Sequence, residues 1–259
     1  FTMYFQKGFF MINSNTFSNF NSKYPIYADL HTHSISSGHG SEDTITDMIR
    51  CASESGLSLF GISDHGPATS SSAKPSYFQS LKLADRDRFG IRVLYGAELN
   101  IINTAGDVDL DDEILSALDY AIISIHPPIF KPYHDKDLSS AYIRAMDHPK
   151  VRFLGHIDDA RFPVDFEYLL EIAKEKHVYP EINNGSLMPD AYRINGQENC
   201  RRILSICKKL DLPVLLSSDS HGKKNIGNMQ YIFPLLEELD FPAHLVLNSD
   251  LSVLSEIIR

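Results

Sequence analysis

Residues 24–40 have the sequence YPIYADLHTHSISSGHG, which joins two kinds of segment. The first half is a short apolar run, typical of a strand buried in a parallel sheet. The second half places Asp29, His31, His33 and His39 directly after that run. A buried strand that passes into several imidazoles predicts a site at the strand's end, provided that other strands end in the same way.

Six more apolar runs follow along the chain, and each is short enough to be a buried strand. With the first, they occupy residues 24–30, 57–63, 91–99, 119–125, 150–155, 177–183 and 212–218. Amphipathic segments with a helical pattern lie between them, at residues 44–55, 166–176, 197–210 and 229–239. Alternating strands and helices predict a parallel sheet. Seven such units predict an α/β protein with a distorted (β/α)7, TIM-barrel-like fold.

Six of these strands end in histidines or carboxylates, which a parallel barrel would bring to one mouth. Beyond the first strand they are Asp64, His65, Glu98, His126, His156, Asp219 and His221. Any one of them alone would be an ordinary polar loop residue, but gathering so many polar groups without cations would be unfavourable. Imidazole and carboxylate ligands together favour Zn, Mn, Fe or Co over Ca.

The number and spacing of these residues predict more than one ion. His31 and His33 are two apart on an extended strand, so they point to the same side and can bind one ion together. The seven histidines with Glu98 and Asp219 are too many for one ion and enough for three, and Glu98 can bridge two of them. We expect Asp29 and Asp64 to act as outer acceptors that fix imidazole tautomers.

The composition excludes several classes of protein. The chain of 259 residues has a formal net charge of -10, which disfavours extended nucleic-acid binding. No run approaches the roughly 18 apolar residues of a membrane span. Cys51, Cys200 and Cys207 form no disulfide framework, which indicates a reduced, cytoplasmic setting.

Two segments are predicted along the chain. Residues 1–23 lack the basic start and cleavage site of a signal peptide, and we interpret them as an N-terminal extension. That extension is either a native arm or an artefact of expression or of start-site assignment. Residues 24–259 are predicted to be a single domain.

The motifs DLHTHS, ISDHGP, GAELNI, HPPIF, LGH, EINNGS, ENCR and SSDSH resemble those of the PHP (polymerase and histidinol phosphatase) family. Within the family the chain looks like the YcdX-like phosphatase branch, from Tyr27 to the C-terminus. The resemblance implies a distorted (β/α)7 barrel that holds three divalent ions, foremost Zn, with Mn or Fe as other choices. It assigns His31, His33, Glu98 and Asp219 to one ion, Glu98, His126 and His156 to the second, and His39, His65 and His221 to the third.

The implied activity is metal-dependent hydrolysis of a small phosphate monoester by a metal-bound hydroxide. Glu98, Asp219 and His126 are the predicted catalytic ligands. For substrate binding we predict Lys131, Arg161, Lys223 and Asn183, which follow strand ends and can donate to phosphate oxygens. Arg161 is the first choice, because a guanidinium can fork onto two oxygens. No membrane partner is expected.

Four alternatives share part of this pattern. A histidinol-phosphate phosphatase would use the same metal set, and a PHP-type nuclease would act on phosphodiesters. His39 at the third-metal position and the acidic net charge argue against the nuclease. A catalytically silent PHP module usually lacks ligands, and all nine positions are filled here. Hydrolysis of an amide is the fourth alternative, because metal centres also polarise carbonyls.

Overall fold

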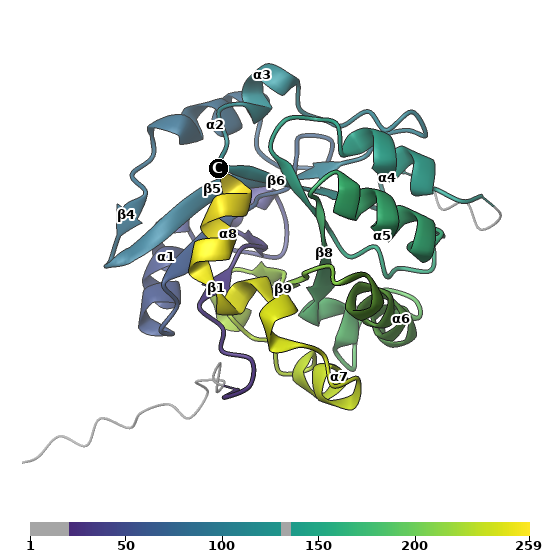
Figure 1. Ribbon diagram of the computed structural model, residues 1–259. Coiled ribbons are helices and arrows are strands. Elements are labelled where there is room, and N and C mark those ends of the chain that lie inside the picture. The colour runs from purple at the N-terminus through teal and green to yellow at the C-terminus, as the bar shows by residue number, and fades with distance from the viewer. Residues whose placement is uncertain (1–20, 131–135) are drawn as a thin grey trace, which may run out of the picture.

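The computed structural model describes residues 21–130 and 136–259. All seven predicted strands are present in one sheet, in the order β1-β3-β5-β6-β7-β8-β9, and each is parallel to its neighbour (Figure 1). They are β1 (Ala28–Asp29), β3 (Leu59–Ile62), β5 (Ile91–Asn100), β6 (Tyr120–Ser124), β7 (Val151–Leu154), β8 (Tyr179–Asn183) and β9 (Leu215–Ser217). A short strand that the sequence did not predict, β4 (Asp87–Arg88), pairs antiparallel with β5. The predicted (β/α)7 barrel is confirmed.

Helices cover the outside of this sheet (Figure 1). They are α1 (Ile45–Glu54), α2 (Pro75–Ser80), α3 (Asp112–Leu115), α4 (Ser139–Ala145), α5 (Phe166–Glu175), α6 (Gly196–Leu210), α7 (Phe233–Glu238) and α8 (Leu251–Ile258). Helix α1 begins with a full capping box between Thr44 and Asp47. The helix predicted at residues 229–239 begins only at Phe233, with Pro234 in the first turn, where a missing N–H is tolerated. Within the described ranges no helix is both long and apolar enough to span a membrane.

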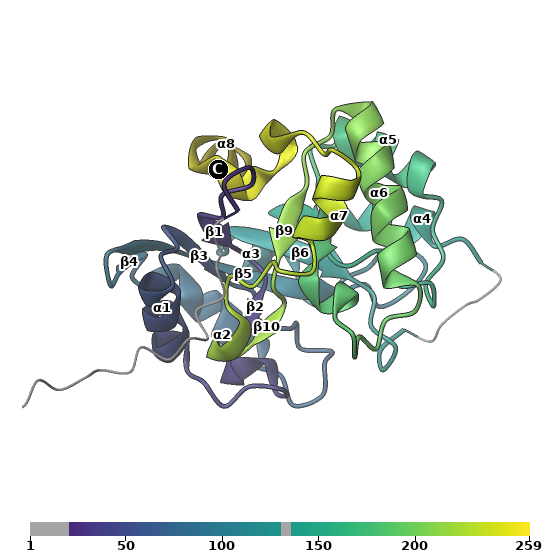
Figure 2. The same cartoon turned by 90° about the horizontal axis from the view of Figure 1, so that it is seen from below.

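Two strand segments that the sequence did not predict join the first and last strands at the mouth of the barrel. They are β2 (Thr32–His33) and β10 (Ser220–His221), which pair in parallel with His33 opposite His221. Because β2 continues β1 and β10 follows β9, this pairing brings the first and last ligand-bearing loops side by side (Figure 2).

Side chains join β1 and β9 further down. Asn248, in the 3-10 turn η6 (Leu247–Ser249), donates its amide to the carbonyl oxygens of Ala28 and Leu216, both at 2.8 Å. Its Oδ1 accepts from the backbone N–H of Leu216 at 2.8 Å. Nearer the mouth, Asp29 accepts hydrogen bonds from Ser218. These contacts fix the two strands where backbone pairing is missing.

The barrel has its own apolar interior, separate from the larger core between sheet and helices. Its members include Ala28, Leu59, Tyr120 and Phe153 from the strands. Leu254 and Ile258 of α8 belong to the same cluster. Figure 2 shows α8 at the end of the molecule opposite β2 and β10. The helix therefore closes the bottom of the barrel and leaves the mouth for the polar residues.

Candidate metal centre

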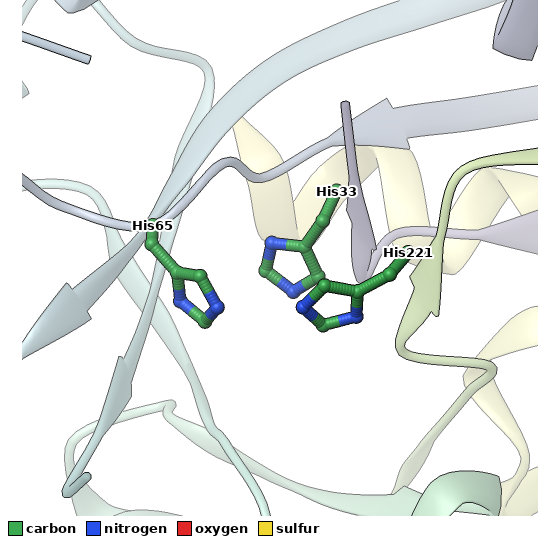
Figure 3. Close-up of side chains that lie close together, drawn as sticks. All are labelled: His33, His65 and His221. Atoms are coloured by element: carbon green, nitrogen blue, oxygen red, sulfur yellow. The ribbon is translucent and has the colours of Figure 1, made fainter. Parts of the chain in front are cut away.

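All nine predicted metal ligands lie at the mouth of the barrel, where the strand ends meet. Figure 3 shows His33 of β2, His65 after β3 and His221 of β10 with their rings directed into the same space. Three groups have ligand atoms close enough to share an ion: His33, His65 and His221; His31, His33 and Glu98; His65, Glu98 and His126. The convergence that the strand-end pattern predicts is therefore present.

Glu98 lies at the centre of the cluster and divides its two oxygens between different imidazoles. It is fully buried near the end of β5. Its Oε1 is 2.8 Å from Nε2 of His156 and 3.2 Å from Nε2 of His126. Its Oε2 is 2.6 Å from Nδ1 of His65 and 3.4 Å from Nε2 of His31. A carboxylate with a separate set of imidazoles at each oxygen has the arrangement that a bridging ligand needs.

Asp219 presents a single oxygen to the cluster. Its Oδ1 is 3.2 Å from Nε2 of His33 and 3.7 Å from Nε2 of His31. Its Oδ2 accepts hydrogen bonds from Arg193 at 2.7 Å and from Asn183 at 3.0 Å. The residue has a left-handed φ of 52°. Residues other than glycine adopt such a φ only where the surrounding structure holds them, and such residues gather at functional sites.

His39 lies at the outer edge of the cluster. Its ring centroid is 4.9 Å from that of His65 and 5.0 Å from that of His221. The three rings predicted to share the third ion are thus neighbours, although in the closest grouping of ligand atoms His33 joins His65 and His221. Gly40, which has a φ of 74°, allows the backbone next to His39 to lie against His221. A Cβ at this position would lie 2.6 Å from the His221 ring.

Glu181 orients His31 from behind. Its Oε1 lies 2.5 Å from Nδ1 of His31, and its Oε2 accepts from the backbone N–H of His156 at 2.7 Å. An imidazole that donates Nδ1–H to a carboxylate keeps Nε2 for a metal ion, which is the usual outer arrangement around ligating histidines. Glu181 was not predicted as a site residue, although a charged residue inside a buried strand was a signal for such a role.

His33 is oriented by a carboxylate that acts through an intermediate side chain. Nδ1 of His33 lies 3.0 Å from Oγ of Ser37, which donates to Asp64 at 2.7 Å. The expected role of Asp64 is thus exerted through a hydroxyl. The contacts of Asp29 are with Ser218 and with backbone N–H groups, including that of Gly227, so it fixes the loop that carries Asp219 rather than an imidazole.

The same arrangement recurs at His126. Its Nδ1 lies 2.7 Å from Oδ1 of Asn100, and the Asn100 amide donates to Asp109 at 2.7 Å. Asp109 thus holds the Asn100 amide in the orientation in which its Oδ1 accepts from the imidazole of His126. His126 is thereby left with Nε2 facing Glu98.

The ligand atoms that face the centre lie close to one another but make no hydrogen bond. Among the described residues, Nε2 of His31, Nε2 of His33, Nδ1 of His65 and Oε2 of Glu98 are buried without a hydrogen bond. Buried polar atoms are almost always satisfied, so four such atoms in one place point to a bound cation. Two or more divalent cations would satisfy them, and the imidazole and carboxylate set fits Zn, Mn or Fe.

The two carboxylates are held in their ionised form. Burial alone would raise the pKa of Glu98, but the imidazoles around it outweigh burial and hold that pKa well below its usual range. Burial would likewise raise the pKa of Asp219, and His31, Arg193 and His33 instead hold it well below the usual value. Both side chains are therefore available as anionic ligands.

The imidazoles of His31 and His33 have opposite shifts. Burial lowers the pKa of His33 well below its usual value, and the neighbouring His65 and His221 add to this effect. Burial would also lower the pKa of His31, but the carboxylates of Glu181, Glu98 and Asp219 raise it well above the usual value. These directions favour a neutral His33, which can bind a cation directly, and a protonated His31, which would release its proton when an ion binds.

A cavity of about 980 Å³ opens over the centre. Arg161 lies in its wall, where Asp159 raises the pKa of the guanidinium through a hydrogen bond and ion pair. Asn183 is buried beneath, bonded to Glu181 and Asp219. Lys223 pairs with Asp43 at 3.0 Å with its side chain 58% exposed, and it is not among the lining residues. Lys131 lies outside the described residues.

The fold and the site together define a parallel barrel with a metal-binding centre at the carboxyl ends of its strands. The family model of the PHP domain matches residues 29–185. A protein of Clostridium acetobutylicum named "Probable phosphatase" is 36% identical over 89% of this chain and 93% of its own length. An Acetivibrio thermocellus protein of the same name is 34% identical, covering 89% of this chain and 94% of its own length. The chain belongs to the PHP family.

Solved structures support the fold assignment. The histidinol phosphate phosphatase of Lactococcus lactis, solved with zinc, L-histidinol and phosphate, matches with a TM-score of 0.58 and 19% identity. The match covers 83% of this chain and 94% of that one. A chain in an archaeal ribonuclease P structure with mature tRNA matches with a TM-score of 0.59 and 18% identity, over 89% of each chain.

Proposed function

We propose that this protein hydrolyses a small phosphate monoester with the help of three divalent metal ions. The hydrolase class, acting on phosphoric esters, is the one that its curated relatives carry in their names. The four buried ligand atoms that make no hydrogen bond carry the metal part of the proposal. The proposed ligands remain His31, His33, His39, His65, Glu98, His126, His156, Asp219 and His221.

Divalent ions held by these ligands would supply charge against the phosphoryl oxygens and would acidify a water for in-line attack. The protein's own part is positioning. Glu98 directs one oxygen to each half of the cluster, and Glu181, Ser37 and Asn100 fix the tautomers of three imidazoles. A rigid ligand set of this kind places the phosphoryl group without reorganisation during the reaction.

Substrate contacts come from the cavity wall. Arg161 is anchored by Asp159 yet lines the cavity, so its guanidinium can donate to phosphate oxygens. Asn183 has its amide committed to Glu181 and Asp219, and we infer that it acts through Asp219. The cavity volume of about 980 Å³ is at the upper end of small-molecule sites, so it has room for an organic group beyond the phosphate. Apolar side chains such as Pro127, Ile129 and Met188 line that room.

The experiment compares p-nitrophenyl phosphate with bis-p-nitrophenyl phosphate, using protein stripped with a chelator and then reloaded with Zn²⁺ or Mn²⁺. We expect metal-dependent turnover of the monoester, with up to three ions per chain by elemental analysis. Glu98→Gln should lower turnover by more than the roughly 10–100-fold that is typical of changes outside the ligand set. His244→Ala, a histidine on the exposed surface, is the matched control and should retain full turnover.

The same assay tests the alternatives. Turnover of the diester alone would replace the monoesterase by a nuclease. Histidinol phosphate belongs in the first panel of natural monoesters, because the Lactococcus lactis protein of similar fold binds histidinol and phosphate. Full activity in metal-free protein, or full metal content in Glu98→Gln, would contradict the proposal.

A further inference from the structure

Arg193 is a buried arginine beside the metal centre that the sequence pattern did not single out. It lies on the loop between η3 (Asn184–Leu187) and α6, with its side chain only 4% exposed. Nη2 donates to Oδ2 of Asp219 at 2.7 Å, and Nη1 donates to Oγ of Ser186 at 3.1 Å. The guanidinium thus donates one hydrogen bond to a proposed metal ligand, Asp219, and another to Ser186 of η3.

Asp158 supplies a second buried charge near this arginine. It is 0% exposed, and neither of its carboxylate oxygens makes a hydrogen bond of good geometry among the described residues, although the nearby Ser186 hydroxyl acts to lower its pKa. Nε of Arg193 is likewise buried without a hydrogen bond in this part of the chain. Burial raises the pKa of Asp158, and the attraction of Arg193 works against that rise. Arg193 therefore contacts Asp219 through a hydrogen bond and interacts with Asp158 only through the longer-range attraction of their charges.

The contacts of Asp219 show what this arrangement does. Both hydrogen-bond donors, Arg193 and Asn183, meet the same oxygen, Oδ2. The other oxygen, Oδ1, faces Nε2 of His31 and Nε2 of His33, which make no hydrogen bond. A carboxylate without such donors is free to rotate or to chelate an ion with both oxygens. Two donors on Oδ2 leave only Oδ1 for the ion.

We propose that Arg193 is a positioning residue that restricts Asp219 to binding the metal through one oxygen. The inference rests on the proposed function, since it requires Asp219 to be a ligand. Lysine would not replace Arg193, because a single ammonium lacks the planar fork that reaches Asp219 and Ser186 together. Arg193 also lines the cavity, so direct contact with the substrate phosphate is the competing role.

Arg161 offers a matched comparison. It lines the same cavity as Arg193. Both guanidinium groups lie near the ring of Tyr192, at 5.0 Å for Arg161 and 5.2 Å for Arg193. Its carboxylate partner is Asp159, which is not one of the proposed ligands. A positioning role and a phosphate-binding role therefore predict different results for the two arginines.

The experiment measures metal binding in Arg193→Gln and Arg161→Gln by competition with a chromophoric chelator, and records the visible spectrum of the Co²⁺-loaded proteins. Arg193→Gln should weaken one metal site by about 10–100-fold and alter the Co²⁺ spectrum, which reports ligand geometry. Arg161→Gln should leave the metal affinity and the Co²⁺ spectrum unchanged. It should weaken the inhibition of p-nitrophenyl phosphate hydrolysis by inorganic phosphate. The inference is overturned if Arg193→Gln weakens phosphate inhibition while metal affinity and spectrum stay as in the parent protein.

Two further variants separate the possible failures. If Asp219→Asn leaves metal affinity unchanged, the ligand assignment behind the proposed function is wrong. If Asp219→Asn weakens binding and Arg193→Gln does not, only the role of Arg193 is wrong. Should Arg193→Gln fail to fold because the buried Asp158 loses the attraction of the guanidinium, the double variant with Asp158→Asn removes that charge. It should fold and still bind metal weakly, and parent-like affinity in it would contradict the inference.

Discussion

A single carboxylate, Glu181, decides which nitrogen of His31 faces the metal centre. Its Oε1 lies against Nδ1 of His31, and its Oε2 holds the backbone N–H of His156, so it supports two of the proposed ligands at once. Burial would raise the pKa of Glu181, but His31 holds it below the usual value. The ionised carboxylate therefore keeps the Nδ1–H tautomer in place.

Glu181→Gln keeps the size of this side chain and removes its charge. The amide can turn its NH₂ toward His31, which would favour the wrong tautomer. We expect metal affinity to fall by about 10–100-fold, as for other outer partners of ligating histidines. Competition with a chelator measures this, and Glu175→Gln at the exposed end of α5 is the control. Equal affinities for the two variants would mean that Glu181 has no orienting role.

At the scale of elements, α8 keeps the mouth of the barrel and its bottom distinct. Leu254 is 0% exposed and packs in the cluster formed by inward-facing strand residues. Leu254→Ala should lower the free energy of unfolding by about 2–5 kcal/mol, because it leaves a cavity inside the barrel. Val253→Ala, 41% exposed on the same helix, should change it by less than about 0.5 kcal/mol. Urea denaturation of both variants tests this, and equal losses would show that α8 does not plug the barrel.

The sequence could predict an element when its signal is local, and it could not when the element depends on contacts between distant parts of the chain. Runs such as residues 119–125 carry their own signal, because burial on both faces makes a parallel strand apolar throughout. The pairing of β2 with β10 has no such signal, since each contributes only two residues and the pairing exists only once the barrel has closed. Asn248 was missed for the same reason, because its partners are Ala28 and Leu216.

The same distinction holds within the site. His31, His33 and Glu98 could be predicted because each directly follows or ends an apolar run, where a parallel barrel has its mouth. Arg193 lies in a loop with no periodic pattern, and its importance comes from Asp219, 26 residues further along the chain. Ser37 and Asn100 likewise look like ordinary polar residues until their contacts with His33 and His126 are known.

At the scale of the whole molecule, folding and metal binding depend on each other. The proposed ligands are spread from His31 to His221 and come together only when the strands are in register. Because the unfolded chain has no preformed site, ions that bind the folded state stabilise it by mass action. The ions would also remove the penalty of the buried, unpartnered atoms of His31, His33, His65 and Glu98.

Metal binding should also release protons, and His31 is their expected source. Its pKa is raised well above the usual value, because Glu181, Glu98 and Asp219 outweigh its burial, so we expect it to carry a proton at pH 7 in metal-free protein. His33, whose pKa is lowered, is already neutral and releases none. Binding through Nε2 of His31 should therefore release about one proton, and affinity should fall about tenfold for each unit that the pH is lowered.

Calorimetry of Zn²⁺ binding at pH 7, in buffers of different ionisation enthalpy, counts the protons directly. In Glu181→Gln the strongest neighbouring charge is gone, so the pKa of His31 should drop and fewer protons should be released. A binding enthalpy independent of the buffer in the parent protein would show that His31 is neutral before the ion arrives. The carboxylates around it would then serve only to orient the ring, and the loss of affinity in Glu181→Gln would reflect the tautomer alone.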